Sequence, residues 1–472
     1  MTEALTNPTG LASTVLGASA GRAFWTLDRV ASALGVESPR GPTELRAVAT
    51  DTRTVTAGDL FVALRGERFD AHDFLAEGVA KGAAAVVVSD VARAARLGVP
   101  VFVVPDTLAA LGLLARYRRR AWNGPVVAVA GSNGKTSTKE LLRAALGSVL
   151  TVHATAGNLN NQIGVPLTLL ALPDDADVAV VEVGTNVPGE IALLRAIAEP
   201  TVAVLTSIGE EHLEGFGDLD GVLREEVAVF DGVGLAVTPA SQPEVAAAAR
   251  GRAGRVVDAG LDAGNVRPER WSLDAEGRGL IVLDSVEVLV TLRGVHNLRN
   301  AMLALVVARE FGVGLERAAA GIAAMPQPSM RSAWEPLGRA TLVNDAYNAN
   351  PPSARAALDL LDGLGPARQR VAVLGSMREL GSDAPALHEA VARYALATGA
   401  DVVAGVGDFA DALRAAGPGD ARVVVADDVD ALWPLLAPRL APDAVVLLKA
   451  SRGMRLERLV PHLRQWAGAA ES

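Results

Sequence analysis

Cysteine is absent from all 472 residues of the chain. Without thiols the protein can form no disulfide bond, no thiolate metal site and no acyl-thioester intermediate. Basic residues are in the minority, since 44 Lys and Arg stand against 54 Asp and Glu and the formal net charge is -10. This balance, with no basic block to offset it, argues against nucleic acid or an anionic membrane surface as a partner. Anionic ligands must therefore be bound by locally placed groups.

Long apolar runs are also lacking. No uninterrupted apolar stretch approaches the roughly 20 residues that a membrane-spanning helix needs, so stable membrane insertion is not expected. The first ten residues, MTEALTNPTG, carry no basic segment of the kind that begins a secretory signal. A cytoplasmic location is therefore the expectation. With 50% hydrophobic residues, the chain can bury the cores of about three domains.

The clearest motif in the chain is GSNGKTST, which follows the apolar run at residues 126–130. The run predicts a buried parallel strand, and the residue spacing from Lys135 onward predicts a helix. Gly131 and Gly134 let the loop turn its N–H groups toward an anion, and Lys135 adds a positive charge beside them. Thr136 is placed to bind Mg²⁺. The motif therefore predicts a phosphate-binding loop.

This loop departs from the most common phosphate-loop pattern. That pattern, G-x-x-x-x-G-K-[ST], has a glycine where this sequence has Val129. The alternative interpretation is a glycine-rich turn with a solvated lysine. The strand expected before the loop and the helix expected after it favour phosphate binding.

The chain divides into three blocks, which we expect to be domains covering residues 1–124, 125–328 and 329–472. Residues 1–20 look like a loose extension of the first block. In the second block, strands expected at 177–183 and 201–208 alternate with helical stretches, which predicts a parallel sheet. The block closes near the proline-rich segment MPQPSMR. The third block repeats the alternation in RATLVNDAY, RVAVLGS, DVVAGVG, ARVVVAD and DAVVLLKAS.

The expected fold class is therefore α/β with three domains. A central parallel-sheet domain carries the phosphate loop, a Rossmann-like domain follows it, and a smaller α/β domain precedes it.

Polar residues follow the expected strands of the central block. Glu182 ends one strand and His212 follows the next, and ligands of parallel sheets gather at such carboxyl ends. A carboxylate there suits the Mg²⁺ of a nucleotide, and an imidazole can complete its shell. The alternatives are a satisfied strand-end carboxylate and a structural histidine. In RGVHNLRNAML, the side chains of His296, Asn297 and Asn300 stand at a helix start, where they can bind a ligand or cap the helix.

Taken together, these motifs resemble the Mur ligase family. The resemblance runs in one consistent order from about Thr50 to Leu459. That family writes its phosphate loop G-x-x-G-K-T-[ST], which this sequence obeys. The segments that carry the resemblance are GSNGKTST, GNLNNQIGVPLTLL, VEVGTNVPGEI, TSIGEEHLEGFGDLDGV, GVHNLRN, NDAYNANPPS, VAVLGSMRELG and LLKASRGMRLE.

The resemblance implies an ATP-dependent, ADP-forming ligase of peptidoglycan precursor synthesis, and so a role in cell-wall biogenesis, cell shape and cell division. ATP would phosphorylate the terminal carboxylate of UDP-N-acetylmuramoyl-tripeptide. The amine of D-alanyl-D-alanine would then attack the acyl phosphate, leaving an amide, ADP and phosphate. The implied cofactors are ATP and Mg²⁺, and a monomer is expected. Because no thiol takes part, the reaction suits a chain without cysteine.

Site residues are implied by matching this sequence to the family motifs. Those matched to catalysis are Lys135, Glu182 and His212. Those matched to the metal are Thr136, Glu182, His212 and Glu226. Those matched to ATP are Gly131, Ser132, Asn133, Gly134, Lys135, Thr136, Ser137, His296, Asn297, Asn300, Arg331 and Asp345. Those matched to the uridine nucleotide, the tripeptide or the dipeptide are Asp51, Thr52, Arg53, Asn160, Asn161, Asp345, Tyr347, Asn348 and Asn350.

Glu226 marks a departure from the family. Its position is one where members usually have a lysine that CO₂ carbamylates to make a metal ligand. The chain has only four lysines, at positions 81, 135, 139 and 449, so a shifted alignment supplies no replacement. We expect Glu226 to act through a water as an outer-sphere Mg²⁺ ligand. The alternative is a solvated helix residue.

Two other functions stay open at this stage. The related ligase that adds the third residue, a diamino acid, carries Asp-Asn-Pro-Arg where this chain has NANPPSAR. A nucleotide-binding interaction protein that has lost catalysis is the second alternative. The sequence also leaves open whether the third residue of the tripeptide is lysine, diaminopimelate or ornithine.

Overall fold

A computed structural model describes residues 24–41, 44–66, 69–365 and 368–470. The extension expected at residues 1–20 lies outside this part of the chain. By their internal contacts, the described residues form two compact units. The first holds residues up to 123 together with 166–175, and the second holds 124–165 together with 176–472.

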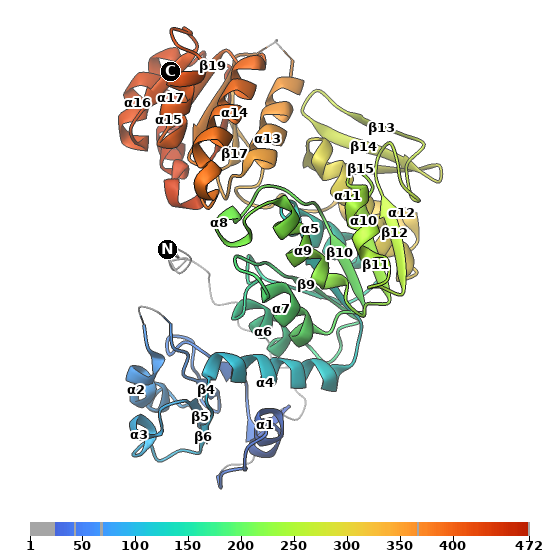
Figure 1. Ribbon diagram of the computed structural model, residues 1–472, viewed down its shortest axis with the longest axis vertical. Helices are drawn as coiled ribbons and strands as arrows, with labels where there is room; N and C mark the ends of the chain where they lie inside the picture. Colours follow the sequence, from blue (N-terminus) through green and yellow to red (C-terminus); the bar gives the residue numbers. More distant parts are fainter. Residues whose placement is uncertain (1–23, 42–43, 67–68, 366–367, 471–472) are drawn as a thin grey trace. The chain divides into compact units, whose positions relative to one another are not determined.

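The first unit is built on a four-stranded parallel sheet with the order β3-β4-β5-β6. Its strand AVVV at 85–88 is buried throughout, as a sheet covered on both faces requires. Phe61 and Phe102 fill its core. Figure 1 shows this unit in blue to cyan, with its helices around the sheet. Its elements are β1 (Trp25–Thr26), α1 (Leu27–Leu34), β2 (Glu44–Leu45), β3 (Val48–Ala49), β4 (Leu60–Val62), α2 (Leu75–Ala80), β5 (Ala85–Val88), α3 (Val91–Ala94), β6 (Val101–Val103) and α4 (Thr107–Trp122).

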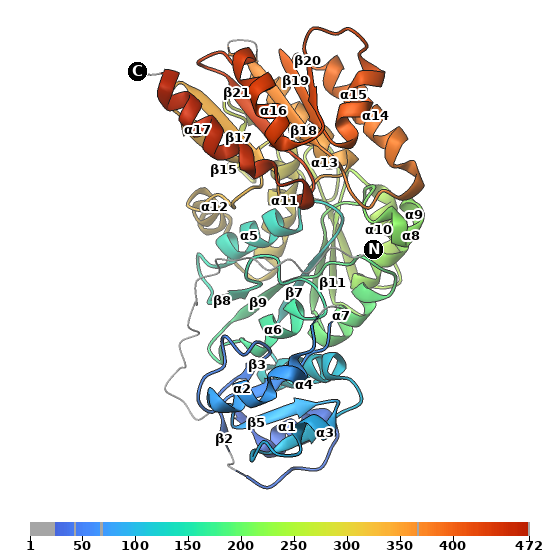
Figure 2. The same cartoon turned by 90° about the vertical axis from the view of Figure 1, so that its left-hand side faces the viewer.

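The second unit begins with a six-stranded parallel sheet of order β12-β11-β10-β7-β9-β8. The strands predicted at 177–183 and 201–208 are confirmed as β9 and β10, which flank β7. Helices α5, α11 and α12 pack together on one face, and α7, α9 and α10 gather on the other (Figure 2). The strands are β7 (Val126–Ala130), β8 (Val152–Ala154), β9 (Val178–Glu182), β10 (Val202–Leu205), β11 (Leu235–Pro239) and β12 (Arg255–Ala259). The helices are α5 (Lys135–Leu146), α7 (Glu190–Ala198), α8 (Leu213–Phe216), α9 (Leu219–Glu226), α10 (Pro243–Ala249), α11 (Val295–Glu310) and α12 (Leu315–Ala323). Helix α6 (Gly164–Leu170) begins in this unit, and from residue 166 it belongs to the first unit.

Between β12 and α11 lies a three-stranded antiparallel sheet that the sequence analysis did not predict. It consists of β13 (Arg270–Leu273), β14 (Arg278–Leu283) and β15 (Val286–Arg293). Buried and exposed residues alternate along most of β15, as in a sheet with one solvated face. The chain then enters α11, which packs against α5 and so brings its first turn toward the phosphate loop.

A second six-stranded sheet forms the C-terminal part of this unit, with the order β16-β17-β21-β18-β19-β20. The five predicted strands are confirmed, and the antiparallel edge strand β16 was not predicted. One face is covered by α13, α14 and α15, and the other by α16 and α17. Its elements are β16 (Ala333–Leu337), β17 (Ala340–Asp345), α13 (Pro351–Gly363), β18 (Arg370–Gly375), α14 (Ala384–Ala397), β19 (Val402–Val406), α15 (Asp408–Ala416), β20 (Val423–Ala426), α16 (Val429–Leu436), β21 (Val445–Lys449) and α17 (Leu459–Ala470).

Among the described residues, no helix has both the length and the apolar character to cross a membrane.

Candidate active site

The predicted phosphate loop connects β7 to the N-terminus of α5, at the middle of the central sheet. Gly131 has a φ of +116°, and a Cβ there would lie 2.5 Å from the Thr206 hydroxyl oxygen. Gly134 has a φ of +87°, and a Cβ there would lie 2.9 Å from the Asn300 amide. Both positions therefore require glycine, for backbone conformation and for space. The second contact places Asn300 directly against the loop.

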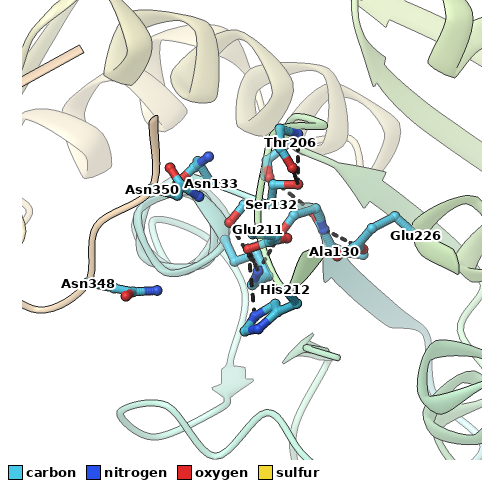
Figure 3. A network of polar contacts seen from close by, with 12 residues as sticks. Ala130, Ser132, Asn133, Thr206, Glu211, His212, Glu226, Asn348 and Asn350 are labelled. Atoms are coloured by element: carbon cyan, nitrogen blue, oxygen red, sulfur yellow. Dashed lines mark hydrogen bonds and ion pairs between the residues drawn. The ribbon is translucent and has the colours of Figure 1, made fainter. Parts of the chain in front are cut away.

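The loop is fixed to the segment that follows β10. The N–H of Ser132 donates to the Ser207 carbonyl at 2.7 Å, and the N–H of Asn133 donates to the Ser207 hydroxyl at 3.1 Å. The Ser132 hydroxyl accepts the N–H of Gly209 at 2.9 Å. The motif TSIGEEH thus supports the phosphate loop as well as supplying His212 (Figure 3).

Lys135 is largely buried at the start of α5. Its ammonium donates to the carbonyls of Gly131 and Ser132, and it lies 4.0 Å from a carboxylate oxygen of Glu211. Burial opposes the charge of Lys135, but the carboxylates of Glu211, Glu226 and Glu182 outweigh it and raise the lysine pKa. The site therefore holds a permanent cation beside the loop.

Glu182 ends β9 and is buried under the phosphate-loop helix. It accepts the Thr136 hydroxyl at 3.0 Å and the Asn160 amide at 2.9 Å. Lys139, one turn after Lys135, is fully buried, and its ammonium lies 3.6 Å from Oε2 of Glu182, the oxygen that accepts the Thr136 hydroxyl. The same ammonium donates to the Gly157 carbonyl at 2.9 Å. These contacts join the helix, the strand end and the 157–160 segment into one polar cluster.

Glu226 ends α9 and is fully buried, so the alternative of a solvated helix residue is wrong. One carboxylate oxygen, Oε2, accepts the N–H of Gly131 at 2.8 Å. The other, Oε1, is buried and has no hydrogen-bond partner in the part of the chain that the structure describes. Burial raises the pKa of Glu226 to about 7, against the opposing effect of the Lys135 charge. Figure 3 shows Glu226 pointing toward the strand end at Ala130.

His212 precedes α8 with a φ of +49°, a left-handed conformation that few histidines adopt. Its Nδ1 lies 2.5 Å from a carboxylate oxygen of Glu379, and its Nε2 lies 3.9 Å from Glu211. Burial lowers the pKa of His212, but these two carboxylates outweigh it and raise the pKa above its ordinary value. The carboxylates beside His212 are therefore those of Glu379 and Glu211, and His212 is not part of the polar cluster around Glu182.

No group of three His, Cys, Asp or Glu side chains within the described ranges could hold a metal ion on its own. The predicted metal residues accordingly lie in three places: Thr136 with Glu182, Glu226 at the back of the loop, and His212 beside Glu379.

The cluster at the start of α11 does not cap its helix. No side chain accepts the free N–H groups of the first turn, and Gly294 stands at the cap position. Asn297 instead donates to the Arg293 carbonyl at 2.8 Å, and Asn300 donates to Asn297 at 3.3 Å. Burial lowers the pKa of His296, so a neutral imidazole is favoured there. The capping alternative is therefore wrong.

The C-terminal sheet brings Asp345 and Lys449 together, because they are paired in register at the carboxyl ends of β17 and β21. Their ion pair measures 2.7 Å, and the Lys449 ammonium also donates to the Asn348 carbonyl at 2.8 Å. Arg331 lies over the Tyr347 ring, 4.2 Å from its centroid. Asn350 caps α13 through a hydrogen bond from the Ser353 N–H at 3.0 Å.

The first unit places Asp51, Thr52 and Arg53 in the turn after β3. Arg53 is exposed and forms an ion pair with Asp51 at 2.5 Å, which lowers the Asp51 pKa. In the second unit, Asn161 accepts N–H groups at the start of α6, at 2.9 Å from Gly164. Ser137 is half-buried in the first turn of α5.

Four charged residues of this region were not singled out from the sequence: Lys139, Glu211, Glu379 and Lys449. The sequence could have indicated Lys449 as a site residue, because it ends an apolar strand just as Glu182 does. The same holds for Lys139, because it follows Lys135 by four residues and so lies on the same side of α5.

A phosphate loop at the middle of a parallel sheet, followed by a strand-end carboxylate, defines a P-loop α/β protein. The sequence models of three Mur ligase domains match successive parts of this chain. These are the Mur ligase family catalytic domain at residues 44–119, the Mur ligase middle domain at 129–308 and the Mur ligase glutamate ligase domain at 331–452. The chain belongs to the Mur ligase family. The three matches confirm the expected family and the three-domain α/β fold.

Relatives that match this chain over most of their length show which Mur ligases it is similar to. The chain is 36% identical over 455 residues to the UDP-N-acetylmuramoyl-tripeptide--D-alanyl-D-alanine ligase of Escherichia coli, covering 93% of this chain and 98% of that protein. The ligase of the same name from Mycobacterium tuberculosis is 34% identical, with 90% and 94% covered. Among solved structures, MurF from Acinetobacter baumannii superposes with a TM-score of 0.85 at 31% identity, covering 93% and 99%. MurF from Thermotoga maritima, solved in complex with ADP, gives 0.79 at 27% identity, covering 90% and 98%.

Proposed function

We propose that this protein is an ATP-dependent, ADP-forming ligase that joins D-alanyl-D-alanine to UDP-N-acetylmuramoyl-tripeptide in peptidoglycan precursor synthesis. The observation that carries the proposal is the near-complete coverage, at 33–36% identity, by relatives that share this ligase name. The proposed reaction forms an acyl phosphate and ADP first. The dipeptide amine then displaces phosphate and loses a proton as the amide forms.

The phosphate loop suits the first step. The reaction must bring two anions together, a carboxylate and a triphosphate, and a carboxylate is a poor electrophile until it is phosphorylated. We propose that Lys135, with the loop N–H groups and the N-terminus of α5, stabilises the negative charge of the transferred phosphoryl group. The raised pKa of Lys135 keeps this group cationic at neutral pH. Positioning and electrostatics, rather than covalent catalysis, are the protein's contribution.

Mg²⁺ fits the oxygen donors of this site. The Thr136 hydroxyl and the Glu182 carboxylate already lie together, and hard oxygen ligands are those that Mg²⁺ prefers. Glu226 contributes the buried, unpartnered Oε1, which we propose faces a water of the metal shell. We also propose that His212 belongs to the metal shell. Bound Mg²⁺ would neutralise phosphate charge, and the described residues alone form no complete metal site.

The remaining site residues are assigned to ligands by the same proposal. His296, Asn297 and Asn300 bind the adenosine, helped by the contact of Asn300 with Gly134. The residues proposed for other ligands are Asp51, Thr52 and Arg53 for the uridine nucleotide, Asn160 and Asn161 for the tripeptide substrate, Arg331 for ATP, Asp345 for ATP and dipeptide, and Tyr347, Asn348 and Asn350 for the dipeptide. We propose domain boundaries at residues 124 and 328, and a cytoplasmic monomer.

A coupled ADP-release assay tests the function. With ATP, Mg²⁺ and UDP-N-acetylmuramoyl-tripeptide, sustained ADP release is expected only when D-alanyl-D-alanine is added. Release with the UDP-linked dipeptide and a diamino acid instead would identify the ligase that adds the third residue. No release with either pair would identify a nucleotide-binding protein without catalysis. Tripeptides ending in lysine, diaminopimelate or ornithine then define the preferred substrate.

A further inference from the structure

The first residue of the phosphate loop, Gly131, is held from several sides. Its N–H donates to Glu226 Oε2 at 2.8 Å, and its carbonyl accepts from the Lys135 ammonium. The space that a side chain would fill is taken by Thr206. Glu226 supplies the one contact in this arrangement that comes from α9, 95 residues away along the chain.

We propose that Glu226 is a positioning residue for the phosphate loop. Its carboxylate fixes the peptide of Gly131 and, through that peptide, the carbonyl on which the Lys135 ammonium rests, so that the loop is shaped before nucleotide or metal arrives. This role is additional to any contact with Mg²⁺. It rests on the proposed function only in that the ligand of the loop is taken to be ATP or ADP.

The hydrogen-bonding needs of the backbone support this role. The N–H of Gly131 follows the last residue of β7, where the ladder to β9 and β10 ends. A buried N–H requires a partner, and the structure gives it an oxygen of the buried Glu226 side chain.

The neighbouring residue, Glu225, makes different backbone contacts from Glu226. Glu225 accepts the N–H groups of Gly189 and Ile191, each at 2.8 Å, at the start of α7. Among the described residues, its hydrogen bonds go to Thr185, Gly189 and Ile191 and none goes to the phosphate loop. Glu225 therefore offers a matched control, being the adjacent residue of the same type, buried and bonded to backbone N–H groups elsewhere.

The test compares Glu226→Gln with Glu226→Leu, using Glu225→Gln as the control. Glutamine keeps an oxygen that can accept the Gly131 N–H, whereas leucine fills similar space without an acceptor. The first measurement is hydrogen–deuterium exchange of peptides covering residues 126–135 in the free, metal-free protein. The second is ADP affinity by calorimetry in excess EDTA, which excludes any metal contribution.

We expect faster exchange of 126–135 in the leucine variant, and roughly tenfold weaker ADP binding, as the loss of one buried hydrogen bond allows. Glu226→Gln should stay close to wild type in both measurements, and Glu225→Gln should leave exchange of 126–135 unchanged. If Glu226→Leu does not fold, Glu226→Met takes its place.

Wild-type exchange and affinity in the leucine variant would overturn the proposal, as would a defect that appears only when Mg²⁺ is present. Failure of the wild-type protein to bind ADP would instead contradict the proposed function. The exchange measurement needs no ligand and decides the role of Glu226 in that case as well.

Discussion

The positive charge of Lys135 interacts with several carboxylates of the site. Three carboxylates act on it, those of Glu211, Glu226 and Glu182, and together they hold its pKa above the ordinary lysine value despite burial. A cation with this environment is retained at neutral pH and needs no ligand to keep its charge. Its ammonium also donates to the loop carbonyls of Gly131 and Ser132.

Lys135→Ala is expected to lower kcat by roughly 10²-fold or more, the scale seen when a group stabilising transition-state charge is removed. The fold should persist, because the lysine lies at the loop and not in the apolar core. ADP-release kinetics and the thermal midpoint are the two measurements. Arg143→Ala, at an exposed position of the same helix, is the control and should keep wild-type kinetics. Activity within a few-fold of wild type in Lys135→Ala would refute the assigned role.

Glu226 predicts a pH dependence of stability. Its pKa in the folded protein is about 7, above the ordinary 4.5, because burial disfavours the charged form. The carboxyl group therefore contributes stability that is present below about pH 4.5 and is lost as pH rises through 7. Glu226→Gln does not titrate. Its thermal midpoint relative to wild type should therefore rise between pH 5 and pH 8, by a few degrees at about 2–4 °C per kcal/mol.

The thermal midpoints of the metal-free proteins are measured by scanning calorimetry between pH 5 and pH 8. Asp220→Asn, at an exposed position of the same helix, should show a difference from wild type that varies little over this range. A difference for Glu226→Gln that stays constant or falls with pH would contradict the prediction.

At the scale of elements, helix α5 supplies the charged and polar side chains next to the phosphate loop. It also supplies side chains that contact Glu182 at the end of β9. Lys135 and Thr136 stand in its first turn, and Lys139 stands one turn later with its ammonium between Glu182, Glu140 and the Gly157 carbonyl. Thr136 and Lys139 both contact the Glu182 carboxylate. A change in the register of this helix would therefore disturb the cation and the carboxylate together.

Lys139→Met should destabilise the protein strongly, by about 3–5 kcal/mol, because it leaves the carboxylate of Glu182 buried without its cation. Methionine fills much of the same space, so the effect reports lost charge pairing more than a cavity. Urea unfolding at neutral pH measures it. Arg143→Met, one turn further along at the surface, is the matched control and should change stability by less than about 1 kcal/mol. Equal stabilities of the two variants would show that the Lys139 pair contributes little.

The elements that could be predicted are those buried on both faces. Runs such as VVAVA in β7 and VVAGV in β19 are apolar throughout, so the sequence alone marks them as parallel strands. Strands β13 and β15 have more exposed positions and lack such runs, whereas β14 contains the apolar run LIVL, which could have indicated a strand. The site divides in the same way. The phosphate loop is a local motif, whereas the burial of Glu226 follows from a contact 95 residues distant, and the segment LREEV reads locally as a solvated helix end.

At the scale of the whole molecule, the four lysines account for all the primary amines of the side chains. Lys81 forms an exposed ion pair with Glu77 at 2.7 Å, and Lys449 is buried against Asp345. Lys135 and Lys139 belong to the phosphate-loop helix. The motif match to the Mur ligases places Glu226 at the position where a carbamylated lysine is expected. Glu226 is fully buried, with one oxygen on the loop and the other without a hydrogen-bond partner among the described residues.

This arrangement predicts that the ligase works independently of bicarbonate. The negative charge of Glu226 comes from its own carboxyl group and needs no CO₂, so at a fixed pH wild-type activity in CO₂-depleted buffer should equal that after bicarbonate is added. Glu226→Ala should be impaired under both conditions. Glu226→Lys should be inactive without CO₂ and recover on addition of bicarbonate, because a carbamylated lysine restores the missing negative charge. Initial rates of ADP release at saturating Mg²⁺ measure all three proteins, and Asp220→Lys controls for an added amine near the helix. Full activity of Glu226→Ala, or stimulation of the wild type by bicarbonate, would show that the negative charge at this position comes from elsewhere.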